Sequence, residues 1–552
     1  MTELVLGLAR HAETERRHPG ASPGTHLLFS SLEASLARKC ALRLLPADCY
    51  GGAVAHAARA AQDLLSEVDA LILSLPPRPS DFGALALVRQ MLGRRIPFVY
   101  LPLGEFPWGA RFYRHLHHYL SPGDLVCFSS TADRAVYERL VASSPAQVSV
   151  LPFGIDPSPY QRASAQRSAT RHSLRIADDE VVFVIHGRIE MEKNVHAAVA
   201  LLSQLARGGH RCRLWLAGPS PGAPALPWGP RPLSALPRAG YWEVLAESLH
   251  SADPGLVWWW GSGSREQVAQ VVGAADIGLN LTLARGENFG FATVEAMAAG
   301  LPVIGTDWGG LKDTIEHGVT GYRVPTVVTG AGAALDHYSL LYWAERLGGD
   351  PALRRRMGAA AAARVQDRYL VDQCTDALLD EVRDLLHGMG GSRAHRWTAL
   401  GQRLFERYSV RIDASPGVLP RPLPPARPCD NDIIRAVLRP YGTRDQDIEP
   451  DPGSVFMFAS VLLRSGPGEV RSADPAYPVS LDLGPAEAAV CALLQARGHL
   501  TYEHLTTAAG LPPGEVAAAL RCLLAAGVVL QSPGGTTRHQ HEEEKSTCGS
   551  WE

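Results

Sequence analysis

The sequence has little lysine, no closely spaced cysteine pair and no long apolar run. Lysine supplies only four of the 53 basic residues, so a lysine placed near glycines stands out. The nine cysteines are scattered and form no C-x-x-C pair, which argues against a zinc or redox site and for a reducing compartment. The first seven residues carry no basic leader, and no apolar run approaches the ~18 residues that span a bilayer. We therefore expect a soluble, cytoplasmic protein without a membrane span.

Neither sign of charge is in excess. The 53 Lys and Arg residues against 56 Asp and Glu residues give a net charge of −3. A surface that binds nucleic acid or anionic membrane over its whole extent is therefore excluded, although a local basic patch is not. With 552 residues, 46% of them hydrophobic, the chain can bury a large apolar core. Its length predicts about three to four domains.

Residues 1–155 alternate short apolar runs with amphipathic stretches, a pattern typical of a doubly wound α/β domain. The expected parallel strands are Leu4–Leu8, Ala41–Leu45, Ala70–Leu75, Phe98–Leu101, Leu125–Phe128 and Val148–Leu151. The expected helices are Thr25–Lys39, Gly52–Leu65, Asp81–Leu92 and Thr131–Val141. A loop is expected over Asp156–Ser168, because it is rich in proline, serine, arginine and glutamine.

Residues 156–386 repeat this alternation and predict a second domain of the same type. The expected strands are Val181–His186, Arg213–Ala217, Leu256–Trp260, Ile277–Leu281 and Val303–Gly305. The expected helices are Val195–Ala206, Arg265–Ala274, Phe291–Ala299, Tyr338–Ala362 and a closing run at Gln366–Leu386. Two such sheets in tandem are expected to face a cleft at the carboxyl ends of their strands, where this architecture binds ligands.

The remaining residues predict a linker, a small module and a tail. Residues 387–429 are expected to be a helical and proline-rich linker that holds modules apart. Residues 430–531 predict a mostly helical module whose order of helices and strand resembles a winged helix-turn-helix. Residues 532–552 predict a disordered tail.

The charge of this module argues against DNA as its partner. Residues 481–530 carry two arginines against four acidic residues, and the expected recognition helix, Gly514–Ala526, carries one arginine. A helix that neutralises phosphates should be basic. The module is therefore expected to bind protein or to dimerise.

The stretch from Glu287 to Gly305 carries the strongest indication of chemistry. Gly290 permits a tight turn, and the helix expected from Phe291 begins with free N–H groups that favour a phosphate. Glu295 lies about two turns beyond Glu287. Its carboxylate can accept hydrogen bonds from two neighbouring hydroxyls, as a sugar or ribose presents them.

A second element, Gly187–Asn194, directly follows an expected strand. Arg188 and Lys193 beside the strand-end glycine can hold a diphosphate, the guanidinium as a two-pronged donor and the ammonium as a point charge. The alternative is a solvated loop in which Glu190 and Glu192 pair with the two cations.

Several motifs together resemble the family 4 retaining glycosyltransferases of the GT-B type. The resemblance rests on Glu287 and Glu295 with seven residues between them, Phe289-Gly290 included, on Gly187–Asn194 as G-R-x-x-x-x-K-N, and on Leu151–Asp156, Gly300–Val303, Gly309-Gly310 and Gly318–Gly321. It covers roughly residues 1–385 and is strongest over 181–325. It implies two Rossmann-like domains, an N-terminal one for the acceptor and a second one for a nucleotide-sugar.

The resemblance also implies residue roles in a hexosyltransferase-like bacterial enzyme. Arg188 and Lys193, with Gly187, would bind the pyrophosphate of the donor, and Glu295 would bind the ribose hydroxyls. Glu287 would contact the transferred sugar, close to the amides of Phe289 and Gly290. Retention by front-face attack needs no covalent nucleophile, and neither a metal nor another cofactor is expected.

The acceptor side departs from the family pattern. Many relatives carry a histidine after the fourth strand, where this sequence has Gly104-Glu105, so Glu105 is the candidate substitute. The usual paired-glycine loop after the first strand is replaced by His11–Thr25. The acceptor is therefore unidentified, and the added module suggests a peptide or a protein. The alternative function is an inactive nucleotide-sugar sensor that acts through the module.

Four further patterns have two interpretations each. His115, His117 and His118 suggest a metal site or a polar helix face, and the D-x-D patterns at 430–432 and 445–447 suggest metal chelation or turns. Trp258–Trp260 suggests stacking on a base or burial in a sheet, and Lys312 suggests a phosphate contact or the start of a surface helix. For the first three patterns we favour the second interpretation, in which the residues have a structural role. For Lys312 the phosphate contact and the helix start are given equal weight.

Overall fold

The computed structural model describes residues 4–9, 23–45, 62–74, 85–86, 88–89, 92, 95–102, 120–140, 145–220, 227–388 and 439–533, apart from gaps at 237, 250–252, 254, 285, 330, 474–476 and 478. The chain forms two compact units. One contains residues 1–156, 285–291 and 364–425, and the other contains residues 157–284, 292–363 and 426–552. None of the helices in the described ranges is long and apolar enough to cross a bilayer. The predicted linker beyond residue 388 and the predicted tail beyond residue 533 lie outside those ranges.

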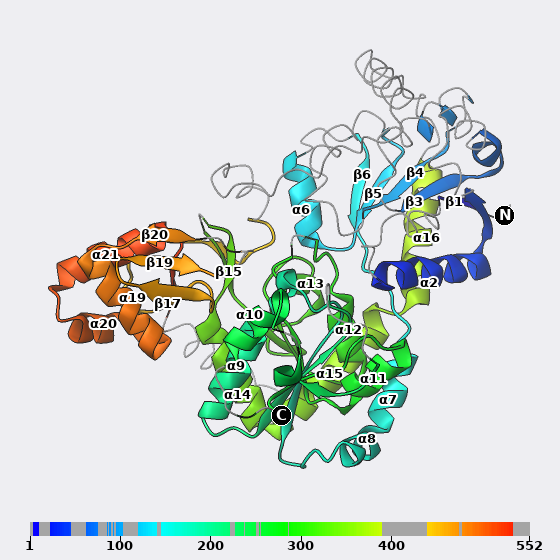
Figure 1. Ribbon diagram of the computed structural model, residues 1–552. Coiled ribbons are helices and arrows are strands. Elements are labelled where there is room, and N and C mark those ends of the chain that lie inside the picture. Colours follow the sequence, from blue (N-terminus) through cyan, green and yellow to red (C-terminus); the bar gives the residue numbers. More distant parts are fainter. Residues whose placement is uncertain are drawn as a thin grey trace, which may run out of the picture. The chain divides into compact units, whose positions relative to one another are not determined.

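The N-terminal unit is built on a six-stranded parallel sheet with the order β2-β1-β3-β4-β5-β6 (Figure 1). The strands are β1 (Val5–Ala9), β2 (Ala41–Leu45), β3 (Ala70–Ser74), β4 (Phe98–Leu101), β5 (Leu125–Phe128) and β6 (Gln147–Val150). Each begins within one residue of its predicted start. Continuous apolar runs fit this sheet because parallel strands are covered on both faces.

Helix α16 (Val371–Gly388) belongs to the core of this N-terminal sheet. Leu378, Leu379, Val382 and Leu385 of α16 are buried among residues of β1, β3, β4 and β5. At its start, Asp372 accepts hydrogen bonds from Ser35 and Arg38 of α2 (Pro23–Lys39). The structure therefore differs from the expectation that residues 366–386 close the second domain, because the apolar face of α16 is buried against the first sheet.

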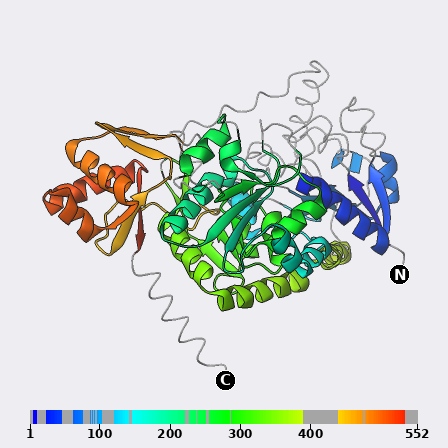
Figure 2. The ribbon, with the colours of Figure 1, turned by 60° about the horizontal axis from the view of Figure 1, so that its bottom comes forward.

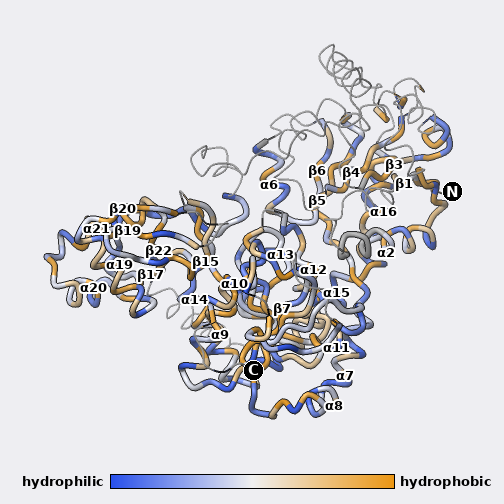
Figure 3. The backbone as a smooth tube through the Cα atoms, in the orientation of Figure 1, coloured by the Kyte–Doolittle hydropathy of each residue, from blue (hydrophilic) through white to orange (hydrophobic). Residues whose placement is uncertain are grey.

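The second unit is built on a seven-stranded sheet with the order β13-β12-β11-β7-β8-β10-β9, in which only β9 is antiparallel. Figure 2 shows this sheet, in green, among the helices of the unit. The strands are β7 (Val181–His186), β8 (Cys212–Ala217), β9 (Arg231–Pro232), β10 (Val257–Trp259), β11 (Ile277–Asn280), β12 (Val303–Thr306) and β13 (Gly321–Val324). All six residues of the central strand β7 are buried, and the strand is hydrophobic along most of its length (Figure 3).

The helices of this unit are close to the predicted ones, except that one predicted helix is two helices in the structure. They include α9 (Val195–Arg207), α10 (Tyr241–Ser248), α11 (Arg265–Ala274), α12 (Phe291–Ala298), α14 (His337–Gly349) and α15 (Pro351–Arg368). The single helix predicted over Tyr338–Ala362 is wrong, because α14 ends at Gly349 and α15 begins at Pro351. Proline is disfavoured within a helix but suits a helix start, so the chain breaks at this point.

The loop predicted over residues 156–168 is also wrong. Two helices occupy this region, α7 (Ser158–Ala165) and α8 (Arg167–Ser173). Helix α7 packs closely on α11, where a Cβ on Gly273 would lie 2.7 Å from the carbonyl carbon of Ala163. Tertiary packing against α11 thus stabilises a helix that the local composition does not favour.

In its described residues, the C-terminal module combines short strands with three helices. It comprises β17 (Ser454–Phe458), β18 (Leu463–Gly466), β19 (Glu469–Ser472), β20 (Ser480–Asp482), α19 (Pro485–Arg497), β21 (His499–Thr501), α20 (Tyr502–Ala509), α21 (Pro513–Ala525) and β22 (Val529–Pro533). The predicted order of helices and final strand is therefore present. The assignment to the winged-helix class stays a prediction.

The module is not held apart from the second sheet domain, contrary to expectation. Val327 of β14 (Thr326–Val328) and Ala334 of β15 (Ala333–Leu335) belong to the module's own apolar core. Strand β16 (Arg444–Asp445) also pairs with β14 in parallel. Shared apolar burial favours this joint arrangement over a free tether. The proline-rich segment itself lies outside the described part of the chain.

Candidate functional site

The strand order of the second unit identifies one place for a ligand. The chain forms β7 first, adds β8 and β10 on one side, and then adds β11, β12 and β13 on the other side. The topological switch therefore lies between β7 and β11. Open α/β sheets bind ligands beyond the carboxyl ends of the strands at such a switch. The loop after β7 contains residues 187–194, and the chain after β11 leads to Glu287.

Two glycines, one after β7 and one after β8, approach each other closely. Gly187 has a φ of 108° and donates its N–H to the carbonyl of Ala217 at 2.9 Å. Gly218, which follows β8, has a φ of 146°, and a Cβ there would lie 1.9 Å from the carbonyl oxygen of Gly187. Side chains are thus excluded between the ends of β7 and β8. Gly218 was not among the residues predicted from the sequence.

Arg188 and Glu190 form an ion pair within this loop. The shortest distance between the guanidinium and carboxylate atoms is 2.8 Å, and the Arg188 side chain is 40% exposed. Burial raises the pKa of Glu190, while the positive charge of Arg188 opposes that rise. For Arg188, this pairing matches the alternative interpretation of the loop. An exposed cation can exchange an intramolecular carboxylate for a phosphate at little cost.

Lys193 ends a short 3-10 turn, Met191–Lys193, that leads into α9. Asn194 follows with a φ of 53°, a left-handed conformation that asparagine tolerates. The carbonyl of Glu192 accepts hydrogen bonds from the N–H of Leu283 at 3.1 Å and from the hydroxyl of Thr282 at 3.3 Å. The turn that carries Lys193 is thereby attached to the loop after β11.

Glu295 is oriented by two residues that the sequence did not single out. Its Oε2 lies 3.0 Å from Nε2 of His186, the last residue of β7. Tyr160 on α7, whose ring centroid lies 6.3 Å from that of His186, is close enough to Glu295 for the carboxylate charge to act on its hydroxyl. Burial first, and then the charge of Glu295, raise the pKa of Tyr160 well above its usual value. A carboxylate is thereby fixed at the carboxyl end of β7, beside Gly187.

Glu287 and its neighbours form a rigid segment that groups with the N-terminal unit. Glu287 is 8% exposed and Asn288 is 9% exposed, and the carbonyl of Asn288 accepts a hydrogen bond from Ser129 at 3.1 Å. The ring of Phe289 lies 5.6 Å from Tyr369 and is also packed against the rings of Phe153 and Phe291. Aromatic packing of this kind fixes the segment that carries Glu287.

The structure brings together some of the predicted residues. Within the second unit, Glu295 and the Gly187–Asn194 loop meet through His186, so two motifs more than 90 residues apart form one group. Glu105 and the three neighbouring histidines lie outside the described ranges. His186 could have been found as a polar residue that ends an apolar strand. Tyr160 could not, because its segment was predicted to be a loop.

The patterns with two interpretations mostly have structural roles. Trp259 is 2% exposed and packs on Trp242, and Trp260 is 5% exposed and packs on Trp215. The Nζ of the half-buried Lys312 donates to the main-chain carbonyls of Pro440 and Gly442.

The second D-x-D pattern, at 445–447, is part of a strand end and a turn. Asp445 pairs with Arg439, and Asp447 accepts a hydrogen bond from the N–H of Glu449. Across the residues that the structure describes, no group of three or more His, Cys, Asp or Glu side chains is placed to hold a metal ion. The first D-x-D pattern, at 430–432, lies outside these residues.

Comparison with solved structures defines the class of fold. Anabaena Alr3699/HepE, crystallised in complex with UDP, superposes with a TM-score of 0.51 and 17% sequence identity, covering 69% of this chain and all of that one. The predicted fold class is confirmed: the chain has a GT-B fold, with two Rossmann-like α/β domains and an added C-terminal module.

Sequence comparison then shows which proteins the second domain is similar to. Residues 166–337 match the family described as Glycosyl transferases group 1. D-inositol 3-phosphate glycosyltransferase from Segniliparus rotundus is 29% identical over 247 residues, which are 45% of this chain and 49% of that protein. N-acetyl-alpha-D-glucosaminyl L-malate synthase from Bacillus anthracis is 34% identical over 148 residues, which are 26% of this chain and 35% of that protein. The chain thus spans about half the length, or less, of these relatives, and the predicted resemblance to GT-B glycosyltransferases is confirmed.

Proposed function

We propose that the protein is a glycosyltransferase that moves a sugar from a nucleotide-sugar to an acceptor with retention of anomeric configuration. The observation that carries the proposal is the Glu295–His186 pair, which fixes a carboxylate beside the Gly187–Lys193 loop at the switch point of the sheet. A fixed carboxylate suits two neighbouring ribose hydroxyls, and the adjacent cations suit a diphosphate. The group 1 match over residues 166–337 supports the same activity.

In this proposal, binding groups and charge supply the catalysis. Arg188 leaves Glu190 and, with Lys193, binds the pyrophosphate, while the amides of Phe289 and Gly290 lie near sugar or phosphate. Glu287 accepts hydrogen bonds from the transferred sugar. The acceptor oxygen bonds to the anomeric carbon on the face from which the phosphate oxygen departs, and that oxygen takes the acceptor proton. Stabilisation of the departing diphosphate by side-chain cations makes a metal unnecessary. Glu105 is proposed to orient the acceptor hydroxyl.

Replacing Lys193 with alanine is expected to raise the Kd for the donor by about 10- to 100-fold, because hydrogen bonds to charged groups contribute ~1.5–3 kcal/mol. Isothermal titration with UDP-glucose and a panel of other nucleotide-sugars measures this change. Lys39→Ala is a matched control, since Lys39 pairs with Asp376 in the N-terminal unit. Equal affinity in the Lys193→Ala variant and in the wild type would contradict the proposed diphosphate site.

We also infer that the acceptor is a peptide or a protein that contacts the C-terminal module. Helix α21 carries a single arginine, Arg521, which pairs with Glu449 at 3.0 Å, so the helix offers no excess of positive charge to DNA. With radiolabelled donor, we expect label to enter tryptic peptides rather than small sugars or lipids. Label found only in small molecules would contradict this inference. Salt-sensitive binding of duplex DNA would contradict it as well.

A further inference from the structure

Residues Arg439–Gln446 belong to the second unit and lie in sequence directly before strand β17 and the rest of the C-terminal module. Residues Pro440–Thr443, called the strap below, lie against the loop that follows β12. Lys312 donates from Nζ to the carbonyl of Pro440 at 3.3 Å and to that of Gly442 at 2.9 Å. Thr443 donates its hydroxyl to Asp307 at 2.8 Å and bonds to the backbone of Thr326. The strap is therefore fixed by side chains that lie more than 100 residues away in sequence.

Tyr441 is the buried centre of the strap. Its side chain is fully buried, and its ring centroid lies 5.5 Å from that of Trp308, which is also fully buried. The carbonyl of Tyr441 accepts a hydrogen bond from the N–H of Gly309 at 3.0 Å. Because both rings are inaccessible, neither can touch a ligand directly. Any effect of these two residues on binding must pass through the groups they contact.

Trp308 connects the strap to the loop that follows β11. Its indole Nε1 donates to the carbonyl of Ala284 at 2.8 Å, and the N–H of Ala284 donates to the hydroxyl of Thr282 at 3.2 Å. Thr306, at the end of β12, also donates to the carbonyl of Thr282 at 2.6 Å. The loops after β11 and β12 are thereby linked to one another by side chains as well as by the sheet.

The loop after β11 also holds the proposed diphosphate-binding turn in place. Leu283 and Thr282 both donate to the carbonyl of Glu192, which directly precedes Lys193. A continuous series of contacts therefore runs from Tyr441 through Trp308 and the loop at 282–284 to the turn that carries Lys193. Ala284 is also covalently followed by the segment that contains Glu287.

We propose that the strap is a positioning element of the donor site, in which Tyr441 acts through Trp308 to set the geometry of the Lys193 turn. This inference rests on the proposed function. It makes the C-terminal module part of the donor-binding machinery, because the strap and the module belong to one continuous segment. The competing interpretation is that the strap only anchors the module to the second sheet domain.

The test uses the full chain and two buried substitutions. Trp308→Phe keeps an aromatic ring against Tyr441 but removes the hydrogen bond to Ala284, and Tyr441→Leu removes the ring that supports Trp308. Each is expected to raise the Kd for the nucleotide-sugar by about fivefold or more, a loss within the range of one hydrogen bond. Because both residues act through one path, the double variant is expected to lose less binding free energy for the nucleotide-sugar than the two single variants lose together. UDP-glucose is the first probe. If another nucleotide-sugar of the panel binds the wild type more tightly, that nucleotide-sugar is used instead.

A control variant loosens the module without touching this path. Tyr477 bonds to Thr329 at 2.7 Å and to the carbonyl of Gly527 at 2.8 Å, and neither bond includes Trp308 or Tyr441. Tyr477→Phe is expected to lower Tm while leaving donor affinity within twofold of the wild-type value. If Trp308→Phe and Tyr441→Leu also lower Tm without changing the Kd, the strap is only an anchor and the inference fails. If Tyr441→Leu does not fold, the same comparison is made with Trp308→Phe alone.

The Lys193→Ala variant separates this failure from failure of the proposed function. If the wild type binds the nucleotide-sugar and Lys193→Ala weakens binding while the strap variants do not, only the strap inference is overturned. If the wild type binds no nucleotide-sugar, the proposed function is overturned.

Discussion

Replacing Glu287 with glutamine is expected to lower kcat by about 100-fold or more, while the donor Kd stays within a few-fold of the wild-type value. Glutamine keeps the size of the side chain but removes its negative charge. Glu287 is 8% exposed in a segment held by Ser129 and by the Phe289 ring cluster, so its position is held by packing. A buried, fixed charge stabilises positive charge that develops on the sugar better in the transition state than in the ground state. Steady-state kinetics together with titration calorimetry separate the two effects.

Glu247→Gln is a matched control for this substitution. Glu247 is an exposed residue of α10, and its replacement is expected to leave kcat and Kd unchanged. Unchanged turnover in both Glu287→Gln and Lys193→Ala would refute the glycosyltransferase assignment. Tight donor binding by the wild type without turnover on any acceptor would favour the alternative of an inactive nucleotide-sugar sensor.

The parallel strands were predictable because burial on both faces leaves a direct record in the sequence. The run Val181–His186 is apolar up to its last residue and is the central strand β7 as predicted. The candidate site residues of the second unit were predicted for a related reason: glycines and charged residues that follow such strands lie at the carboxyl edge of the sheet. Gly187 and Lys193 are examples.

Contacts between distant segments could not be predicted in this way. Helix α7 has the composition of a loop, and its helical structure depends on packing against α11, where Gly273 permits close approach. Tyr160 reaches Glu295 only because α7 forms. The strap was not predicted either, because it depends on contacts between distant residues such as Lys312 and Gly442, which are 130 residues apart. The prolines between them also suggested separate modules.

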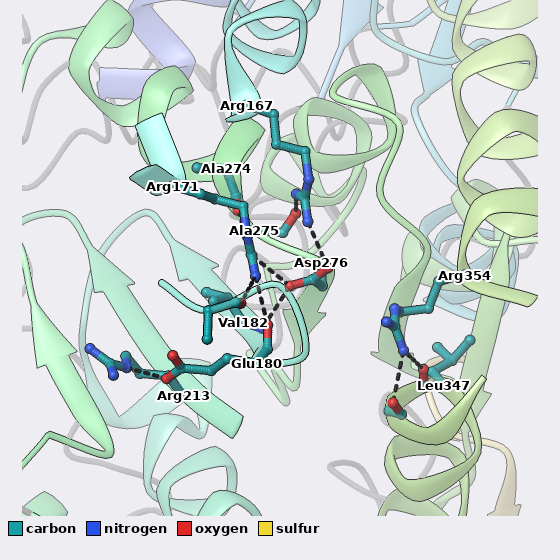
Figure 4. Close-up of polar contacts among 12 residues, drawn as sticks. Arg167, Arg171, Glu180, Val182, Arg213, Ala274, Ala275, Asp276, Leu347 and Arg354 are labelled. Carbon is teal, nitrogen blue, oxygen red and sulfur yellow. Dashed lines mark hydrogen bonds and ion pairs between the residues drawn. The ribbon is translucent and has the colours of Figure 1, made fainter. Parts of the chain in front are cut away.

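Replacing Asp276 with alanine is expected to lower the unfolding free energy by about 3–5 kcal/mol, the largest loss of stability among the substitutions proposed for this protein. Asp276 lies between α11 and β11 and pairs with Arg167 at 2.6 Å and with Arg171 at 2.9 Å (Figure 4). It also accepts the N–H of Val182 at 2.8 Å, which fixes the start of β11 beside β7. Burial lowers the pKa of Arg167, and the charge of Asp276 opposes that shift.

The cost arises because Arg171 would remain as a buried cation without its carboxylate. Arg171 is 8% exposed, and its other described partners are the main-chain carbonyls of Ala177, Glu180 and Ala274, which carry no full charge. Thermal unfolding is expected to show a fall in Tm of about 4–7 °C for a unit of about 330 residues. Asp179→Ala is the matched control, because the Asp179–Arg211 pair is 61% and 64% exposed and such pairs contribute about 0–1 kcal/mol. Equal losses of Tm in the two variants would show that burial of Arg171 does not determine the stability of the second sheet domain.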